Sequence, residues 1–188
     1  MAKGNSSRFR LLPYQALAKR WRGPSLLMIP AGAALLWASP QLAASGIRSV
    51  TLSLTVLVVG ALIFVYTLVA SRAHISCHDN RFVVHTPLYP VTFSYQRITI
   101  IRSVEFGTLF PAGKAQSPKW RLYRDLWGKT AATIELKGFP MPCWWLKLWL
   151  HPYLFHPTET GLVVPVDDWM RFIRQMETLR TTWRQQRY

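Results

Sequence analysis

The chain has 188 residues, 50% of them hydrophobic and 13% aromatic, and this composition excludes a mainly disordered state. Its length suits one ordinary domain, or a small domain with membrane segments, and makes two independent folded domains improbable. Lys and Arg outnumber Asp and Glu by 23 to 8, a net charge of +15, which indicates an anionic partner such as lipid headgroups or nucleic acid.

Two uncharged segments, residues 24–45 and 49–71, come first. A helix of about 20 apolar residues crosses the hydrocarbon core of a bilayer, so each segment is long enough. Pro30 and Pro40 are tolerated in a spanning helix, although they favour a kink. Because the turn between the segments is very short, the sequence predicts a transmembrane hairpin with both chain ends on one side. Neither segment contains Asp, Glu, Lys, Arg or His, which disfavours a transporter or pump.

Charge indicates the orientation of this hairpin. The leader, residues 1–23, contains Lys and Arg but no acid, whereas the turn carries only Arg48. Positive residues stay in the cytoplasm, so we predict a multi-pass protein of the cell membrane with both termini cytoplasmic. An alternative is a secretory signal peptide over residues 1–44, since small residues precede Ser45. The long leader and the second apolar segment favour the hairpin.

From Arg72 onward the pattern changes to short strands, which define a cytoplasmic domain over residues 72–188. Alternating or β-branched runs separated by turn residues predict strands at 74–77, 82–86, 91–95, 98–106, 130–136 and 161–166, with another possible from Lys119 onward. About six or seven short strands are usual for a small antiparallel sheet or barrel.

The chain ends in a predicted amphipathic helix. Its apolar positions recur at helical spacing and are Trp169, Phe172, Ile173, Met176, Leu179 and Trp183. Asp167 or Asp168 suits the N-cap, because a carboxylate there accepts free backbone N–H groups. A catalytic carboxylate dyad is disfavoured, since adjacent residues at a helix start point apart.

Two spanning helices, then HISCHDNRFVVHTPLYPVTFSYQRITIIRSVEF, then GLVVPVDDWMRFIRQMETLR, resemble the membrane-anchored bacterial pleckstrin-homology-like (PH-like) proteins over residues 72–187. The resemblance implies a bent antiparallel barrel or sandwich of about seven strands, capped by the C-terminal helix. It also implies a platform for binding and scaffolding. The basic cluster that phosphoinositide-binding relatives carry at the first strand turn is absent from residues 78–81, so no headgroup specificity is implied.

A basic and aromatic segment, residues 107–129, interrupts the predicted strands. Its candidate contact residues for lipid or a partner are Lys114, Lys119, Trp120, Arg121, Arg124 and Trp127. Near an anionic bilayer each Lys or Arg contributes about 1 kcal/mol, so this loop is a candidate lipid contact. The alternative, equally supported, is a solvated hairpin whose aromatic rings pack on the domain.

A Trp-rich insert, residues 138–157, is the second unusual segment, and it is too short to cross a membrane. Its candidate contact residues are Trp144, Trp145, Lys147 and Trp149. On a short helix the Trp residues share a broad face and Lys147 can extend to the headgroups. Contact with membrane or a partner is favoured over packing on the domain itself.

Catalytic and metal sites are disfavoured. The two cysteines, Cys77 and Cys143, exclude a disulfide framework and a four-cysteine zinc site. On a strand His74 and His78 share a face that Cys77 does not, which opposes a compact Cys/His site. No phosphate loop or nucleophile elbow is present, so we expect neither an enzyme nor a cofactor.

The sequence therefore predicts a non-catalytic, membrane-anchored binding or scaffolding module. Its expected partners are anionic membrane lipid and an unidentified membrane or cytoplasmic protein, with self-association left open. Nucleic acid is disfavoured, because the positive charge is spread along the chain without a recognition motif. The alternative function is an accessory subunit of a larger integral membrane complex.

Overall fold

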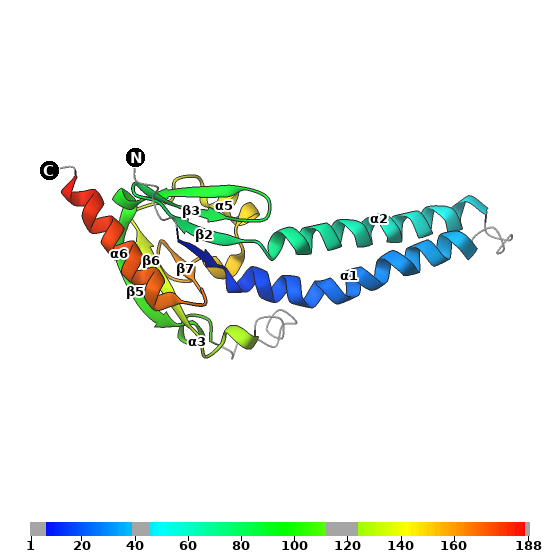
Figure 1. Ribbon diagram of the computed structural model, residues 1–188, viewed down its shortest axis with the longest axis horizontal. Helices are drawn as coiled ribbons and strands as arrows, with labels where there is room; N and C mark the ends of the chain where they lie inside the picture. Colours follow the sequence, from blue (N-terminus) through cyan, green and yellow to red (C-terminus); the bar gives the residue numbers. More distant parts are fainter. Residues whose placement is uncertain (1–6, 39–45, 112–123, 187–188) are drawn as a thin grey trace. The chain divides into compact units, whose positions relative to one another are not determined.

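The computed structural model describes residues 7–38, 46–111 and 124–186, which divide into two compact units (Figure 1). The helix unit is Leu17–Ser71, and the sheet unit combines the residues up to Ala16 with those from Arg72 onward. We expected residues 1–23 to form a leader apart from the domain. Instead the sheet unit includes residues up to Ala16, because strand pairing draws Arg8–Arg10 into a sheet.

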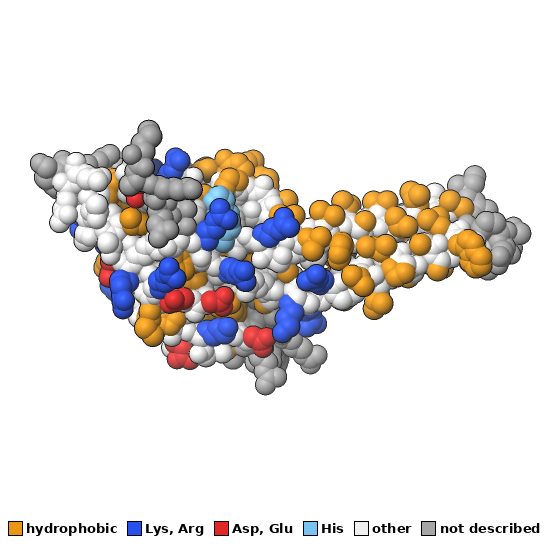
Figure 2. Space-filling view, viewed as in Figure 1, with side chains coloured by type: hydrophobic (Ala, Val, Ile, Leu, Met, Phe, Trp, Pro, Cys, Tyr) orange, Lys and Arg blue, Asp and Glu red, His pale blue; other side chains and the backbone are white. Residues whose placement is uncertain are grey.

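The helix unit consists of most of α1 (Leu12–Ala38) together with α2 (Gly46–Ala70). Large exposed hydrophobic side chains cover it (Figure 2). Among the described residues one helix, Val50–Ala70, has the length and composition to cross a membrane. This finding agrees with the second predicted segment.

The first predicted segment, residues 24–45, is helical as far as Ala38, and its remainder lies outside the described residues. α1 differs from our expectation in beginning at Leu12, so that Lys19, Arg20 and Arg22 lie inside the helix. Its described apolar part is too short to count as a spanning helix by itself, and the second crossing stays a prediction.

α1 and α2 approach closely at two glycines. A Cβ atom on Gly32 would lie 2.9 Å from both the Cβ and the backbone nitrogen of Leu57. One on Gly60 would lie 2.8 Å from the Cβ of Met28. These distances leave no room for a side chain, so both glycines permit the helix contact.

The first sheet has the order β1-β2-β3-β4, with all neighbours antiparallel. Its strands are β1 (Arg8–Arg10), β2 (His74–Cys77), β3 (Arg81–His85) and β4 (Pro90–Ser94). Side chains alternate between the two faces, and the inner face is buried and apolar. It carries Phe9, Ile75, Cys77, Phe82, Val84, Val91 and Phe93.

The second sheet has the order β5-β6-β7 and is also antiparallel. Its strands are β5 (Ile98–Glu105), β6 (Thr130–Leu136) and β7 (Gly161–Val164). Six of the seven described strands match predicted ones, and β1 is the strand that we did not predict. Residues 119–123 of the further predicted strand lie outside the described residues.

The barrel that we predicted is not closed, because the described strands form two separate sheets of four and three strands. The chain leaves the first sheet through a short 3-10 helix, η1 (Tyr95–Arg97), which Ser94 caps by accepting a hydrogen bond from the Gln96 N–H. One isolated bridge, between Leu11 and Val166, joins the segments that follow β1 and β7.

The C-terminal helix α6 (Trp169–Gln185) lies beside β5 and β6 (Figure 1). The Asp168 carboxylate caps it by accepting from the Arg171 N–H, as predicted for this position. Phe172 and Met176 are fully buried, and the Phe172 ring meets Phe9 edge-on at 5.1 Å. Arg180 Nη2 donates to the carbonyls of Ile98 and Thr99 at 2.9 and 2.7 Å, which fixes the helix to the start of β5.

The described part of the sheet unit also contains four further short helices: α3 (Phe106–Leu109), η3 (Arg124–Leu126), α5 (Cys143–Trp149) and η4 (Pro152–Leu154). Leu12, at the start of α1, is buried in a cluster with Phe106, Leu126, Ala131 and Val163. The residues before the helix unit therefore contribute to the core of the sheet unit.

Candidate functional site

The Trp-rich insert forms α5, the short helix that the sequence predicts there. Leu146, Leu150 and Leu154 recur every four residues, are at most 2% exposed, and anchor the segment in the domain. Leu146 is the buried residue of α5, whereas Trp144 is 69% and Leu148 63% exposed on its outward side. The insert therefore packs on its own domain through leucine and leaves tryptophan at the surface.

Tyr14, in the first turn of α1, holds the end of α5. Its hydroxyl donates to the Trp149 carbonyl at 3.3 Å and accepts from the His151 N–H at 3.0 Å. The Tyr14 ring also meets the His151 ring edge-on at 5.9 Å. Because Tyr14 is 3% exposed, this contact is part of the core, and the segment is fixed in position.

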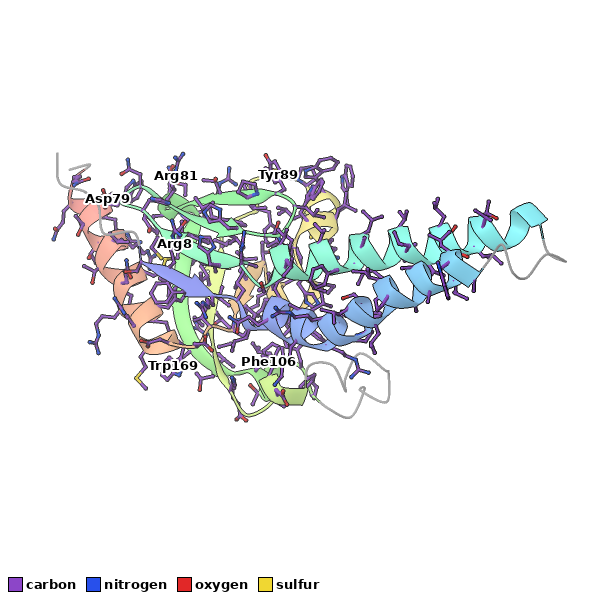
Figure 3. All side chains as sticks on the ribbon, turned by 45° about the vertical axis from the view of Figure 1, so that its right-hand side comes forward. Arg8, Asp79, Arg81, Tyr89, Phe106 and Trp169 are labelled. Carbon is purple, nitrogen blue, oxygen red and sulfur yellow. The ribbon has the colours of Figure 1, made fainter. Side chains whose placement is uncertain are left out.

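The turn between β3 and β4 continues the exposed surface of α5. The Tyr89 ring lies 5.8 Å from the Trp149 ring, which in turn lies 5.7 Å from Trp145 (Figure 3). Thr86 fixes this turn, since its hydroxyl both donates to the Tyr89 carbonyl and accepts from the Tyr89 N–H. We call the exposed part the aromatic surface, comprising Leu88, Tyr89, Trp144, Trp145 and Leu148.

Two polar features border the aromatic surface. Lys147 is exposed on α5 between Trp145 and Leu148. The indole nitrogen of Trp149 is buried and lacks a hydrogen-bond partner among the described residues. The aromatic surface thus combines amphipathic rings with one cation, the composition of side chains found at a membrane interface.

The predicted basic loop is described only in part. Lys114, Lys119, Trp120 and Arg121 lie outside the described residues, and Arg124 begins η3 without a described side chain. Trp127 is half-buried, because its indole N–H donates to the Phe110 carbonyl at 2.8 Å and its ring meets Phe106 edge-on at 5.5 Å. Trp127 therefore packs on the domain, as predicted by the alternative in which the aromatic rings of this loop pack on the domain.

The two cysteines differ in environment. Cys77 is buried on the inner face of β2, where its thiol donates to the Met176 sulfur at 3.6 Å. Burial raises the pKa of Cys77 to about 12. Cys143 is exposed at the start of α5, beside Trp144. Because Cys77 is buried and Cys143 is exposed, Cys143 is the reactive thiol of the folded protein.

Sequence reasoning missed a cluster of histidines. It placed His74 and His78 on one face of a strand and Cys77 on the other, and the buried Cys77 agrees with that arrangement. Sequence reasoning did not predict that His85 lies beside His74, because this contact depends on the register of β2 with β3. Within the described part of the chain, no three His, Cys, Asp or Glu side chains are close enough to hold a metal ion.

The aromatic surface and the histidine cluster are thus the two features of the sheet unit that its core does not explain. In the histidine cluster the Ser76 hydroxyl lies 3.0 Å from His85 Nε2, but Ser76 is buried and out of reach of a substrate, so binding is the chemistry that each feature supports best. Comparison with protein-family models, with curated proteins and with solved structures found no match to this chain. The PH-like resemblance accordingly stays a prediction from the sequence.

Proposed function

We propose that the protein is a membrane-anchored, non-catalytic binding module whose sheet unit is PH-like and lies at the cytoplasmic face of the cell membrane. The two antiparallel sheets and the C-terminal helix with buried Phe172 and Met176 support the PH-like assignment. The observation that carries the binding function is the aromatic surface, which a rigid part of the domain leaves exposed.

Pairing of β1 with β2 supports two membrane crossings. Arg10 lies opposite His74, so the chain segments before and after the helix unit belong to one sheet. They must then lie on the same side of any membrane that the chain crosses between them. If α2 crosses once, the segment before it, which includes the uncharged residues 24–38, supplies the return crossing.

Charge supports the cytoplasmic side for the sheet unit. Lys19, Arg20 and Arg22 lie just before the uncharged part of α1 and are exposed. Basic residues at this position remain in the cytoplasm when a hairpin inserts. The sheet unit, which is continuous with this end of α1, lies on the same side.

Cys143 tests this topology, because it is the reactive thiol of the folded protein. A membrane-impermeant maleimide is expected to label Cys143 in inverted vesicles and to leave it unlabelled in sealed right-side-out vesicles. Cys143→Ser should abolish labelling in inverted vesicles, which controls for reaction at Cys77. Labelling of Cys143 in intact right-side-out vesicles would contradict the proposed orientation.

The occupant that the aromatic surface fits best is the headgroup region of the bilayer. Trp and Tyr rings favour this region because they are apolar with one polar edge, and Lys147 adds attraction to anionic lipid worth about 1 kcal/mol. Tethering by the helix unit raises the effective concentration of lipid at this surface, so weak contacts suffice. A protein that covers the same surface is the competing occupant.

A fluorophore on Cys143 tests lipid contact directly. The full chain, labelled there with nitrobenzoxadiazole and placed in nanodiscs, is expected to be quenched by lipids that carry a nitroxide at the headgroup. Trp144→Ser with Trp145→Ser should reduce the quenching, and Lys147→Glu should remove the preference for phosphatidylglycerol over phosphatidylcholine. Met170→Ser is the matched control, since Met170 is an exposed apolar residue of α6.

Quenching that is absent, or equal in the wild type and the double Trp variant, would reject lipid as the occupant. A stoichiometric protein that co-purifies with the wild type, and is lost in the double Trp variant, would then favour the accessory-subunit alternative.

A further inference from the structure

The outer face of the first sheet gathers positively charged and titratable side chains from three strands. Arg8 lies opposite Ser76, and Arg10 lies opposite His74, which itself lies opposite His85. Directly opposed residues of antiparallel strands point to the same face, so these side chains share one surface. Figure 2 shows histidine side chains next to Lys and Arg on this side of the molecule.

A single hydroxyl group connects the histidines of this surface. Ser76 Oγ lies 3.0 Å from His85 Nε2 and 3.2 Å from His78 Nε2. The His74 ring stacks on the His85 ring, with centroids 4.5 Å apart and planes 14° from parallel. His74 Nδ1 donates to the Arg72 carbonyl at 2.8 Å, because a carbonyl only accepts. The three imidazoles are therefore held in defined positions by hydrogen bonds and stacking.

The charge on this surface is unbalanced. Among the described residues the one ion pair joins Arg102 and Glu135 on the second sheet, so neither Arg8 nor Arg10 pairs with a described acid. Burial lowers the pKa of His85, and the positive charges of His74, His78 and Arg8 lower it further. Protonation of His85 is therefore opposed by its surroundings, and an anion bound there would remove part of that opposition.

Few other charged groups of the described residues lie near this surface. Asp79 belongs to the turn between β2 and β3, and Arg81 begins β3 (Figure 3). β4 contributes Pro90, Thr92 and Ser94, which do not titrate. On the side of α6, a pocket of 450 Å³ places Asp167, Asp168 and Arg171 alongside Arg8 and Arg10. Asp168 caps α6, so one of these two acids already has a role. Cations remain in excess.

We propose that this cationic face, formed by Arg8, Arg10, His74, His78 and His85, binds a phosphate group and that protonation of its histidines strengthens the binding. Guanidinium groups offer paired N–H donors to phosphate oxygens, and imidazolium donates from both ring nitrogens. Strand register brings together Arg8, Arg10, His74 and His85, and His78 follows the end of β2. The cationic face is also separate from the aromatic surface, so the proposal does not rest on lipid contact there.

Linkage fixes the sign of the pH effect. A bound dianion stabilises imidazolium, so it raises the pKa of His85 and its neighbours, and the complex takes up protons. The contribution of the histidines to binding is then greater at pH 6 than at pH 8, by about threefold to tenfold for uptake of part of one proton over this range. As the pH falls from 8 to 6, a phosphate group is itself protonated and loses negative charge. This loss weakens its binding, so any tightening at pH 6 comes from the protein and not from the ligand.

Nuclear magnetic resonance of the histidine side chains measures this effect in the full chain. In zwitterionic detergent micelles, pyrophosphate is expected to raise the pKa of His85 and to leave His156, in the loop before β7, unchanged. Arg8→Gln and His85→Gln should each weaken pyrophosphate binding several-fold. Arg102→Gln is the control, because it removes an exposed arginine from the second sheet.

Nanodiscs that contain phosphatidic acid distinguish a lipid headgroup from a soluble phosphate. A response of His85 to pyrophosphate in micelles identifies a site open to soluble phosphates, whereas a response only to phosphatidic acid identifies a headgroup site. The proposal is overturned if His85 responds to neither. It is also overturned if His156 shifts as much as His85, or if Arg102→Gln weakens binding as much as Arg8→Gln.

Discussion

Replacing Leu11 by Ala is expected to lower the free energy of unfolding of the sheet unit by about 2–5 kcal/mol. Leu11 is completely buried, and its N–H donates to the Ala73 carbonyl at 3.2 Å. It also forms the isolated bridge to Val166, so it touches the segments next to both sheets. Since small domains are stable by about 5–15 kcal/mol, this loss is a large part of the total.

Cys77 provides the measurement for Leu11→Ala. Its thiol is buried beneath α6, so pulse labelling in increasing urea reports the opening of the sheet unit and not of the helix unit. The urea midpoint should fall markedly in Leu11→Ala. Arg10→Ala, one residue earlier but on the exposed face of β1, should change stability by about 0.5 kcal/mol or less. Equal midpoints for the wild type and Leu11→Ala would show that the N-terminal segment is not part of this core.

A fragment that begins at Arg72 is expected to be unstable for the same reason. It would lack β1, Leu11, Leu12 and Tyr14, and so would expose the inner face of β2 and the end of α5. Binding experiments on the sheet unit therefore require the full chain.

Gly32→Ala and Gly60→Ala are expected to destabilise the helix unit by about 1–3 kcal/mol each. In an exposed helix the same change would stabilise by about 1 kcal/mol, because Ala has the higher helix propensity. At Gly32 the new methyl group would meet the backbone of Leu57 at 2.9 Å, and backbone cannot rotate away as a side chain can. The close contact should thus reverse the sign of the effect.

Gly23 supplies the matched control in the same helix. A Cβ atom there would meet nothing within 4 Å, so Gly23→Ala should leave the helix unit unchanged or stabilise it. Thermal unfolding in detergent, followed by far-ultraviolet circular dichroism, compares the three variants. If Gly32→Ala and Gly60→Ala raise the melting temperature as Gly23→Ala does, the two helices do not approach at these glycines.

The sequence is sufficient to predict elements whose pattern is local. The alternation in β3 and β4, the helical period of α6 and the cap at Asp168 each arise within a few residues. The short helix of the Trp-rich insert was predicted for the same reason. Its burial pattern was harder to infer, because α5 ends at Trp149 and only Leu146 of the buried leucines Leu146, Leu150 and Leu154 lies in this helix.

Features that depend on distant pairing could not be predicted. β1 is three residues long, and its partner β2 follows only after the whole helix unit, so no local pattern marks it as a strand. His85 joins His74 through strand register, and the acceptor for the Trp127 indole is a backbone carbonyl of another segment. In each case tertiary structure determines the contact, and the types of the residues do not predict it.

The pairing of β1 with β2 also sets an order of events during synthesis. β1 leaves the ribosome before the helix unit, whereas β2 follows it, so the first sheet cannot be completed until Leu17–Ser71 has been made. Closing so long a loop is slow when its interior is free, and a folded helix hairpin that brings its own ends together would shorten the search. The sheet unit would then assemble only after the helix hairpin between β1 and β2 has formed. A chain whose hairpin fails would keep Phe9 and Leu11 exposed and available to quality-control proteases.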